Sequence, residues 1–246
     1  MEQKFEKHVP ILFLDPKCSH RGVCHRSRHV PCQYLFSFAN VKIKARVETK
    51  MCFSERVSWL AFGTNGFGVA RALQKYPDDK QKRTLAYTLG FIGSMQGFEA
   101  LLWRDPKNHT VAAAAMMLNH AQPLVFWALS SKLHSKSIDK ERRARNLATL
   151  YSTVAGAYTA TQLKENLVTQ TPCGLLWEWN YGRLAPLVYA LYLASCLATL
   201  DAYYDDSKTL SIVFLTTFAA SAGVYRHNNM IGSMWCFYSA FLPWLL

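Results

Sequence analysis

Long apolar stretches alternate with short polar loops from residue 53 to the end of the chain. The stretches are residues 53–72, 85–103, 111–130, 146–163, 184–204, 209–225 and 231–246. About 20 apolar residues are enough to cross the roughly 30 Å hydrocarbon core of a bilayer. Because lipid offers the backbone no hydrogen-bonding partner, each stretch should be helical. The pattern predicts an all-α integral membrane bundle of about seven transmembrane helices.

Two of these stretches carry a weaker signal. Residues 146–163 contain several hydroxyl side chains, and residues 231–246 are short for a span. Hydroxyls can bond within their own helix, and bilayers thin around short spans. Both stretches therefore stay in the predicted bundle, with six spans as the alternative. The Trp177-Glu178-Trp179 segment before the fifth stretch is typical of an aromatic belt at a membrane surface.

The distribution of Lys and Arg predicts an orientation. Twelve of these residues lie in or beside the loops after the first, third and fifth stretches, against five after the second, fourth and sixth. Cytoplasmic loops carry the excess of positive charge. We therefore expect the first helix to start outside and the C-terminal end to lie in the cytoplasm.

Residues 1–50 differ in composition from the rest of the chain. They hold ten of the 28 Lys and Arg residues and no long apolar stretch. Ten positive charges directly before the first helix would pull its start into the cytoplasm, against the loops. This conflict disappears if the functional chain starts at Met51. We expect residues 1–50 to be a disordered or extraneous basic extension, with a genuine cytoplasmic arm as the alternative, and residues 51–246 to be the transmembrane domain.

The extension contains Cys and His residues that suggest a zinc site. They are Cys18, His20, Cys24, His25, His29 and Cys32. The spacing between Cys18 and Cys24 is wider than that of a zinc knuckle, and no second pair repeats it. We therefore expect no metal and no cofactor. The basic residues of the extension are not patterned enough to predict a nucleic-acid partner.

Polar residues inside the apolar stretches are the candidates for function. Each is costly in hydrocarbon and should face the bundle interior. These candidates are Gln96, Glu99, Trp103, Asn119, His120, Gln122 and Asp201. Spacings of three and four residues place Gln96, Glu99 and Trp103 on one helix face. Pro123 follows the next group and removes a helix hydrogen bond there, which makes the local backbone more polar.

The candidate residues predict a polar pocket between the second, third and fifth helices. Its function would be to bind or move a small or lipidic ligand within the bilayer. An intramembrane lipid-modifying enzyme with Glu99 or His120 as acid or base is one alternative, and a purely structural membrane component is another. A retinal protein is excluded because no stretch contains the Lys that its Schiff base requires.

Three segments resemble one family of membrane proteins. They are Met51-Cys52-Phe53-Ser54, the segment Gln-Gly-Phe-Glu-Ala-Leu-Leu-Trp at residues 96–103, and Gly-Ser-Met-Trp-Cys-Phe at residues 232–237. The family is an uncharacterised group of multi-pass proteins with members in bacteria, large DNA viruses and algae. The resemblance covers residues 51–246 and departs at Ala100, where the family more often has Gly. It implies a multi-pass topology and a start at Met51, without an activity.

Overall fold

A computed structural model describes residues 54–163, 167–171, 174–225 and 231–246. The helices are α1 (Glu55–Lys75), α2 (Lys80–Gly93), α3 (Met95–Arg104), α4 (His109–Ser130), α5 (Ile138–Gln162), α6 (Ala185–Tyr203), α7 (Ser207–Tyr225) and α8 (Ile231–Ser239). The described part of the chain also contains two strands, β1 (Val168–Thr171) and β2 (Gly174–Trp177), and two 3-10 turns, η1 (Glu178–Tyr181) and η3 (Leu242–Leu245). The basic extension and its suggested zinc ligands lie outside the described residues.

Four helices begin at polar side chains that cap their first turn. Ser54, Asp79, Asn108 and Ser137 each accept a hydrogen bond from the backbone N–H three residues later, at 3.4, 3.0, 3.1 and 3.2 Å. Such a cap satisfies one of the first four N–H groups, which have no partner inside the helix. Polar residues of the loops therefore determine where α1, α2, α4 and α5 begin.

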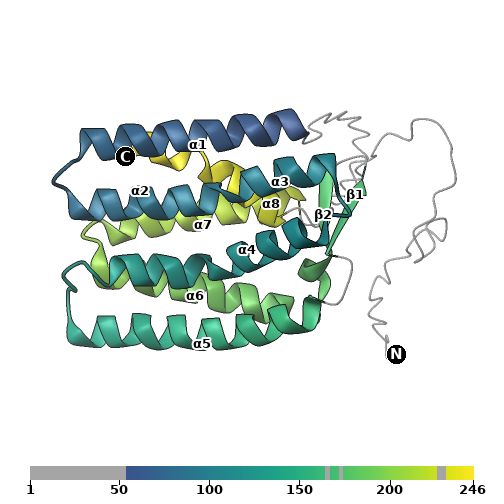
Figure 1. Ribbon diagram of the computed structural model, residues 1–246. Coiled ribbons are helices and arrows are strands. Elements are labelled where there is room, and N and C mark those ends of the chain that lie inside the picture. Colours follow the sequence, from purple (N-terminus) through teal and green to yellow (C-terminus); the bar gives the residue numbers. More distant parts are fainter. Residues whose placement is uncertain (1–53, 164–166, 172–173, 226–230) are drawn as a thin grey trace, which may run out of the picture. The chain divides into compact units, whose positions relative to one another are not determined.

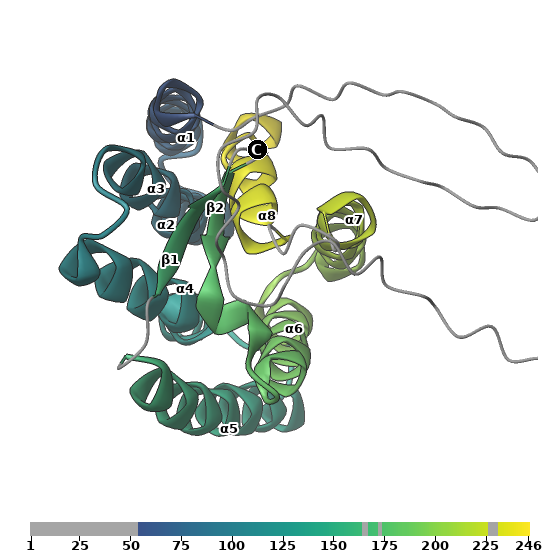
Figure 2. The same ribbon diagram turned by 90° about the vertical axis from the view of Figure 1, so that its right-hand side faces the viewer.

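The long helices run up and down, and the chain reverses direction after α1, α3, α4, α5 and α6, while α3 continues in the direction of α2 (Figure 1). The loops after α1, α4 and α6 lie at one end of this bundle. The loop between α3 and α4 and the hairpin of β1 and β2 lie at the opposite end. In the end view, α5 packs against α4 and α6, and the hairpin crosses this end of the helices (Figure 2).

Every predicted apolar stretch contains helix, so the all-α prediction is confirmed for most of the described chain. Two stretches are not single helices. Residues 85–103 fall in α2 and α3, which meet at Ser94, where the hydroxyl donates to the carbonyl of Phe91 at 2.6 Å. Gly93 and Ser94 are weak helix formers, which favours a break at this point. Residues 231–246 form the short α8 and then η3.

The hairpin before α6 was not predicted. Val168 of β1 lies opposite Trp177 of β2 in an antiparallel pair. Trp177 and Trp179 are only 1% and 2% exposed, and their ring centres lie 4.5 Å apart. The prediction of an exposed aromatic belt at these residues is therefore wrong. Strands of four residues are too short for an alternating pattern to stand out in the sequence.

Large apolar side chains lie on the outer surface of the helices, while polar side chains are buried between them. Leu60 and Phe67 of α1 are 70% and 74% exposed, and Ile212 of α7 is 65% exposed. The buried polar residues include Ser58, Asn65, Gln96, Glu99, Asn119, His120, Gln122, Thr159 and Thr199. A helix in water usually has its apolar stripe inward and its polar face outward. The interior here also holds a large apolar core, and the departure from that pattern is the set of exposed Leu, Phe and Ile side chains.

Within the part of the chain that the structure describes, one helix is long and apolar enough to cross a membrane. It is α6, with a mean hydropathy of 1.4 over its most apolar window. The 22-residue α4 has the length for a span. Its polar residues Asn119, His120 and Gln122 lower its hydropathy.

Candidate functional site

A cavity of about 430 Å³ lies between α2, α4, α6, α7 and the C-terminal turn η3. Most of its wall is apolar, including Leu85, Leu89, Ile92, Phe126, Val213 and Phe214. Small-molecule sites typically have volumes of roughly 300–1,000 Å³ and mostly apolar walls with a few polar groups. The cavity therefore has the size and the lining of a binding site for a small molecule.

One end of the cavity is polar and lies beside the start of α2 and α7. Asp79, Gln81, Lys82 and Asp206 line this mouth. Gln81 Nε2 donates to the carboxylate of Asp205 at 3.0 Å, and the side-chain oxygen of Gln81 accepts from the Asp205 N–H at 3.2 Å. Lys82 Nζ lies 3.7 Å from the carboxylate of Asp79. The Gln81 contacts join the first turn of α2 to the turn before α7, and the lining places both signs of charge at the mouth.

Tyr76 lies next to the mouth, between two ammonium groups. The nitrogens of Lys75 and Lys82 are 4.6 and 3.8 Å from the centre of its ring. A hydrogen bond with Lys75 and the positive charges of both lysines lower the pKa of the Tyr76 phenol from its ordinary value. The edge of the mouth is therefore electropositive on the α1 side.

The inner end of the cavity holds a buried hydrogen-bonded pair. The Tyr192 hydroxyl of α6 donates to Gln122 Oε1 of α4 at 2.5 Å, and both side chains line the cavity. Gln122 is 1% exposed, and its Nε2 makes no hydrogen bond of ordinary geometry with a described residue. The Cys236 thiol, a weak hydrogen-bonding group, interacts with the same amide. The Gln122–Tyr192 pair is therefore a buried polar contact beside the apolar part of the cavity.

Aromatic rings hold Tyr192 in place. Its ring packs against Tyr151 of α5 and Trp235 of α8, with centres 5.8 and 5.1 Å away. Trp235 also contacts Phe214, which lines the cavity, and its Nε1 donates to Thr217 of α7 at 3.2 Å. Side chains of α5, α7 and α8 therefore hold the Tyr192 ring of α6, and with it the hydroxyl that bonds to Gln122. Edge-to-face aromatic contacts of this kind favour one arrangement of the rings.

The predicted face of Gln96, Glu99 and Trp103 forms part of the bundle interior. Gln96 and Glu99 are 0% and 2% exposed, and Gln96 Nε2 donates to the Glu99 carboxylate at 3.0 Å. Trp103 is half-buried and packs on the apolar core. The prediction that this face points inward is confirmed. None of the three lines the cavity.

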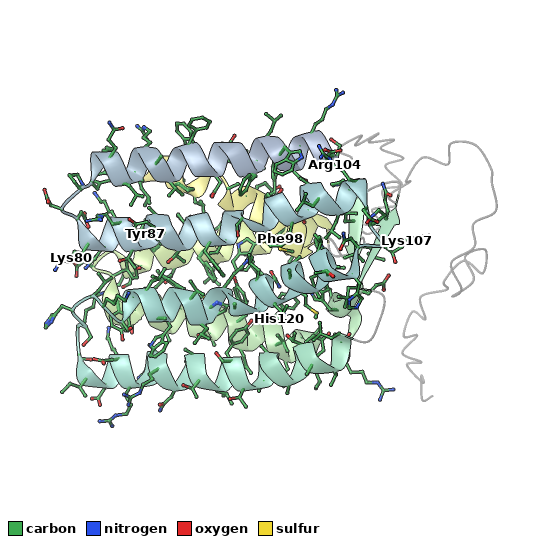
Figure 3. The ribbon with its side chains drawn as sticks, viewed as in Figure 1. Lys80, Tyr87, Phe98, Arg104, Lys107 and His120 are labelled. Carbon is green, nitrogen blue, oxygen red and sulfur yellow. The ribbon has the colours of Figure 1, made fainter. Side chains whose placement is uncertain are left out.

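The neighbouring candidates on α4 divide between two sides of that helix. His120 Nδ1 is hydrogen-bonded to the Thr159 hydroxyl of α5 at 2.6 Å, and the Tyr151 hydroxyl donates to the His120 carbonyl at 3.0 Å. Figure 3 shows His120 inside the bundle. Asn119 is buried as well, at 7% exposed. The structure describes all seven candidate residues, and Gln122 is the one among them that lines the cavity.

Asp201 lies at the end of the bundle. Its carboxylate accepts from Lys140 Nζ of α5 at 2.7 Å, and the side chains of the pair are 45% and 40% exposed. Asp201 therefore joins α6 to α5 near the bundle surface. Glu99, His120 and Asp201 bond to Gln96, Thr159 and Lys140, respectively.

Several residues of the cavity were not predicted as functional. Tyr192 and Cys196 belong to an apolar stretch and give no signal of their own, because both residue types commonly pack in cores. The α7 residues Val213 and Phe214 become relevant only through the packing of α7 against α6. Among the described residues, no group of three His, Cys, Asp or Glu could hold a metal ion.

No family model, curated protein or solved structure matches the chain. The resemblance to the uncharacterised multi-pass family therefore stays a prediction from the quoted segments. Functional inference depends on the geometry of the cavity.

Proposed function

We propose that residues 51–246 form a multi-pass integral membrane protein that binds or moves a small or lipidic ligand. The ligand occupies the cavity between α2, α4, α6 and α7. The cavity itself carries this proposal, because an apolar wall between the charged mouth and the buried Gln122–Tyr192 pair suits a molecule with a large apolar part.

A bilayer around the helices accounts for the distribution of residues. Leu60, Phe67 and Ile212 would contact acyl chains, and the buried polar residues would be kept from lipid. The end with the loops after α1, α4 and α6 would face the cytoplasm, since it carries more Lys and Arg. The mouth of the cavity lies at this end, so the ligand would enter from the cytoplasmic side.

Filling the cavity tests this function. A Val213→Trp substitution would project an indole into the cavity, whereas Ile212→Trp places the same side chain on the outer surface. Aminoanthracene, a small fluorophore that brightens in apolar sites, serves as the probe in detergent solution. We expect saturable fluorescence with the wild type and with Ile212→Trp, and at least a tenfold weaker affinity with Val213→Trp. Equal binding by all three proteins would contradict the proposed function.

A further inference from the structure

The cavity changes from charged to apolar along the two helices whose first turns form its mouth. After Lys82 of α2 and Thr209 of α7, the lining residues on these helices are Leu85, Thr88, Leu89, Ile92, Leu210, Val213 and Phe214. The Thr88 hydroxyl donates within its own helix, to the Thr84 carbonyl at 2.9 Å. Lys82 and Ile92 lie ten residues apart in α2, which is about 15 Å of helix. A long apolar space with a charged entrance suits an amphiphile whose head stays at the mouth.

The side of the mouth formed by α1 and α2 carries more positive than negative charge. The ammonium groups of Lys82 and Lys75 lie 3.8 and 4.6 Å from the centre of the Tyr76 ring. Asp79 offsets one of these two groups, since its carboxylate lies 3.7 Å from Lys82 Nζ. The Lys82 side chain is 43% exposed, so its ammonium group can still meet a ligand at the mouth. This side therefore attracts an anionic group.

The α7 side of the mouth carries the carboxylate of Asp206. This residue is exposed, and its carboxylate accepts from the Thr209 hydroxyl at 2.8 Å. None of the ion pairs in the described part of the chain includes Asp206. Lys136 Nζ donates to the hydroxyl of the next residue, Ser207, at 3.2 Å, but Lys136 does not line the cavity. The α7 side therefore attracts a cationic group.

We propose that the cavity binds a zwitterionic amphiphile of the phospholipid class, with a phosphate and an ammonium group in its head. The phosphate lies beside Lys82, the ammonium group lies beside Asp206, and the apolar chain follows the lining of α2 and α7 inward. A head with a single charge would gain one of these contacts and meet a like charge at the other. This inference rests on the proposed function and adds the ligand class.

Three amphiphiles with the same dodecyl chain test the inference. Dodecylphosphocholine carries both charges, dodecyl phosphate only the negative charge, and dodecyltrimethylammonium only the positive charge. Each competes with aminoanthracene for the purified full chain at pH 8 and low salt, in a nonionic amphipol, because a detergent would itself compete as a single-chain amphiphile. We expect dodecylphosphocholine to bind about fivefold more tightly than the other two, since ionic contacts at exposed side chains are weak. Phosphocholine, which has no chain, should not displace the probe.

Two variants remove the charges of the mouth one at a time. Lys82→Gln keeps the backbone N–H that bonds to Asp79, and Asp206→Asn keeps an oxygen that can accept from Thr209. In Lys82→Gln, dodecylphosphocholine should lose its advantage over dodecyltrimethylammonium. In Asp206→Asn, it should lose its advantage over dodecyl phosphate. The two preferences therefore change separately if each residue meets its own part of the head.

The matched controls are Lys80→Gln and Asp78→Asn. Both residues are exposed and neither lines the cavity, so these changes remove the same charges near the mouth without touching the site. Both controls should keep the wild-type preferences. An equal loss of preference in the controls would mean that the general charge of this end selects the ligand, which would overturn the roles of Lys82 and Asp206.

Other outcomes separate this inference from the proposed function. Tighter binding of either singly charged amphiphile than of dodecylphosphocholine, or equal binding of all three, would overturn the zwitterionic ligand class. Displacement by phosphocholine alone would overturn the role of the chain. In these cases, loss of aminoanthracene binding in Val213→Trp would still support the cavity as the binding site. Equal probe binding in Val213→Trp would instead remove the proposed function and the inference together.

Discussion

Several buried polar side chains in this bundle bond across helix interfaces. His120 of α4 pairs with Thr159 of α5, and Tyr192 of α6 pairs with Gln122 of α4. Each pair satisfies two polar groups in an apolar environment, where an unpaired group is costly. Such hydrogen bonds also fix which helix faces which, because a shift of one turn would leave both partners unsatisfied.

The pair between His120 and Thr159 predicts a stability effect. Thr159→Val keeps the side-chain shape, removes the hydroxyl and leaves a buried imidazole nitrogen without its partner. We expect a loss of about 1–2 kcal/mol and a lower melting temperature in detergent. Thr153→Val is the control, since that exposed hydroxyl bonds only to its own helix at Thr149. Equal melting temperatures for the two variants would show that the interhelical bond contributes nothing.

Burial of single residues could be predicted, but their partners could not. The spacing of Gln96 and Glu99 placed both on one inward face, which the structure confirms, because a helix fixes its own geometry. The partner of His120 and that of Asp201 both depend on how α5 packs, since Thr159 and Lys140 belong to that helix. Hydropathy along one segment contains no information on these contacts.

At the scale of elements, the contact of α1 with the junction of α2 and α3 depends on Gly93, a residue without a side chain. Asn65 of α1 is buried, and its amide donates to the Leu89 carbonyl at 3.2 Å. A Cβ atom at Gly93 would lie 2.3 Å from the Asn65 side chain. Gly93 therefore permits the close approach of α1 at the place where the α2 helix ends.

Gly93→Ala should destabilise the bundle by about 1–3 kcal/mol, because the methyl group overpacks against Asn65 and disturbs its hydrogen bond. Gly156→Ala is the matched control on α5, with nothing within 4 Å of the added Cβ. That change should stabilise by about 0.5–1 kcal/mol through the helix preference of Ala. Thermal unfolding in detergent measures the loss of stability expected for Gly93→Ala and the gain expected for Gly156→Ala. Adding Asn65→Ala to Gly93→Ala should recover part of the loss, and no recovery would contradict the steric explanation.

The positions of the helices could be predicted from the sequence better than the breaks within them. The seven apolar stretches all contain helix, since their composition and length favour it. Hydropathy does not register the break at Ser94, because a span of apolar residues stays apolar across a bend. The β1–β2 hairpin depends on burial of Trp177 and Trp179 against the bundle, which is a tertiary effect.

At the scale of the whole molecule, the loops at the two ends of the bundle differ in their number of Lys and Arg residues. Lys80 marks the end that is richer in them, and Arg104 and Lys107 mark the other end (Figure 3). The end with Lys80 also contains the loop between α4 and α5, including the exposed His134. If the helices lie in a bilayer as proposed, the positive-inside rule for loops near the membrane makes this asymmetry predict the orientation.

Cysteine labelling in intact cells tests this orientation. The background replaces the cysteines outside the buried pair of Cys196 and Cys236 with Ser; these are Cys18, Cys24, Cys32, Cys52 and Cys173. A membrane-impermeant maleimide should then label Lys107→Cys in intact cells, and His134→Cys only after the membrane is permeabilised. This expectation follows from twelve Lys and Arg residues on the His134 side against five on the Lys107 side. The reverse labelling pattern would mean that the ten positive charges of residues 1–50 determine the orientation, and the mouth of the cavity would then open to the outside.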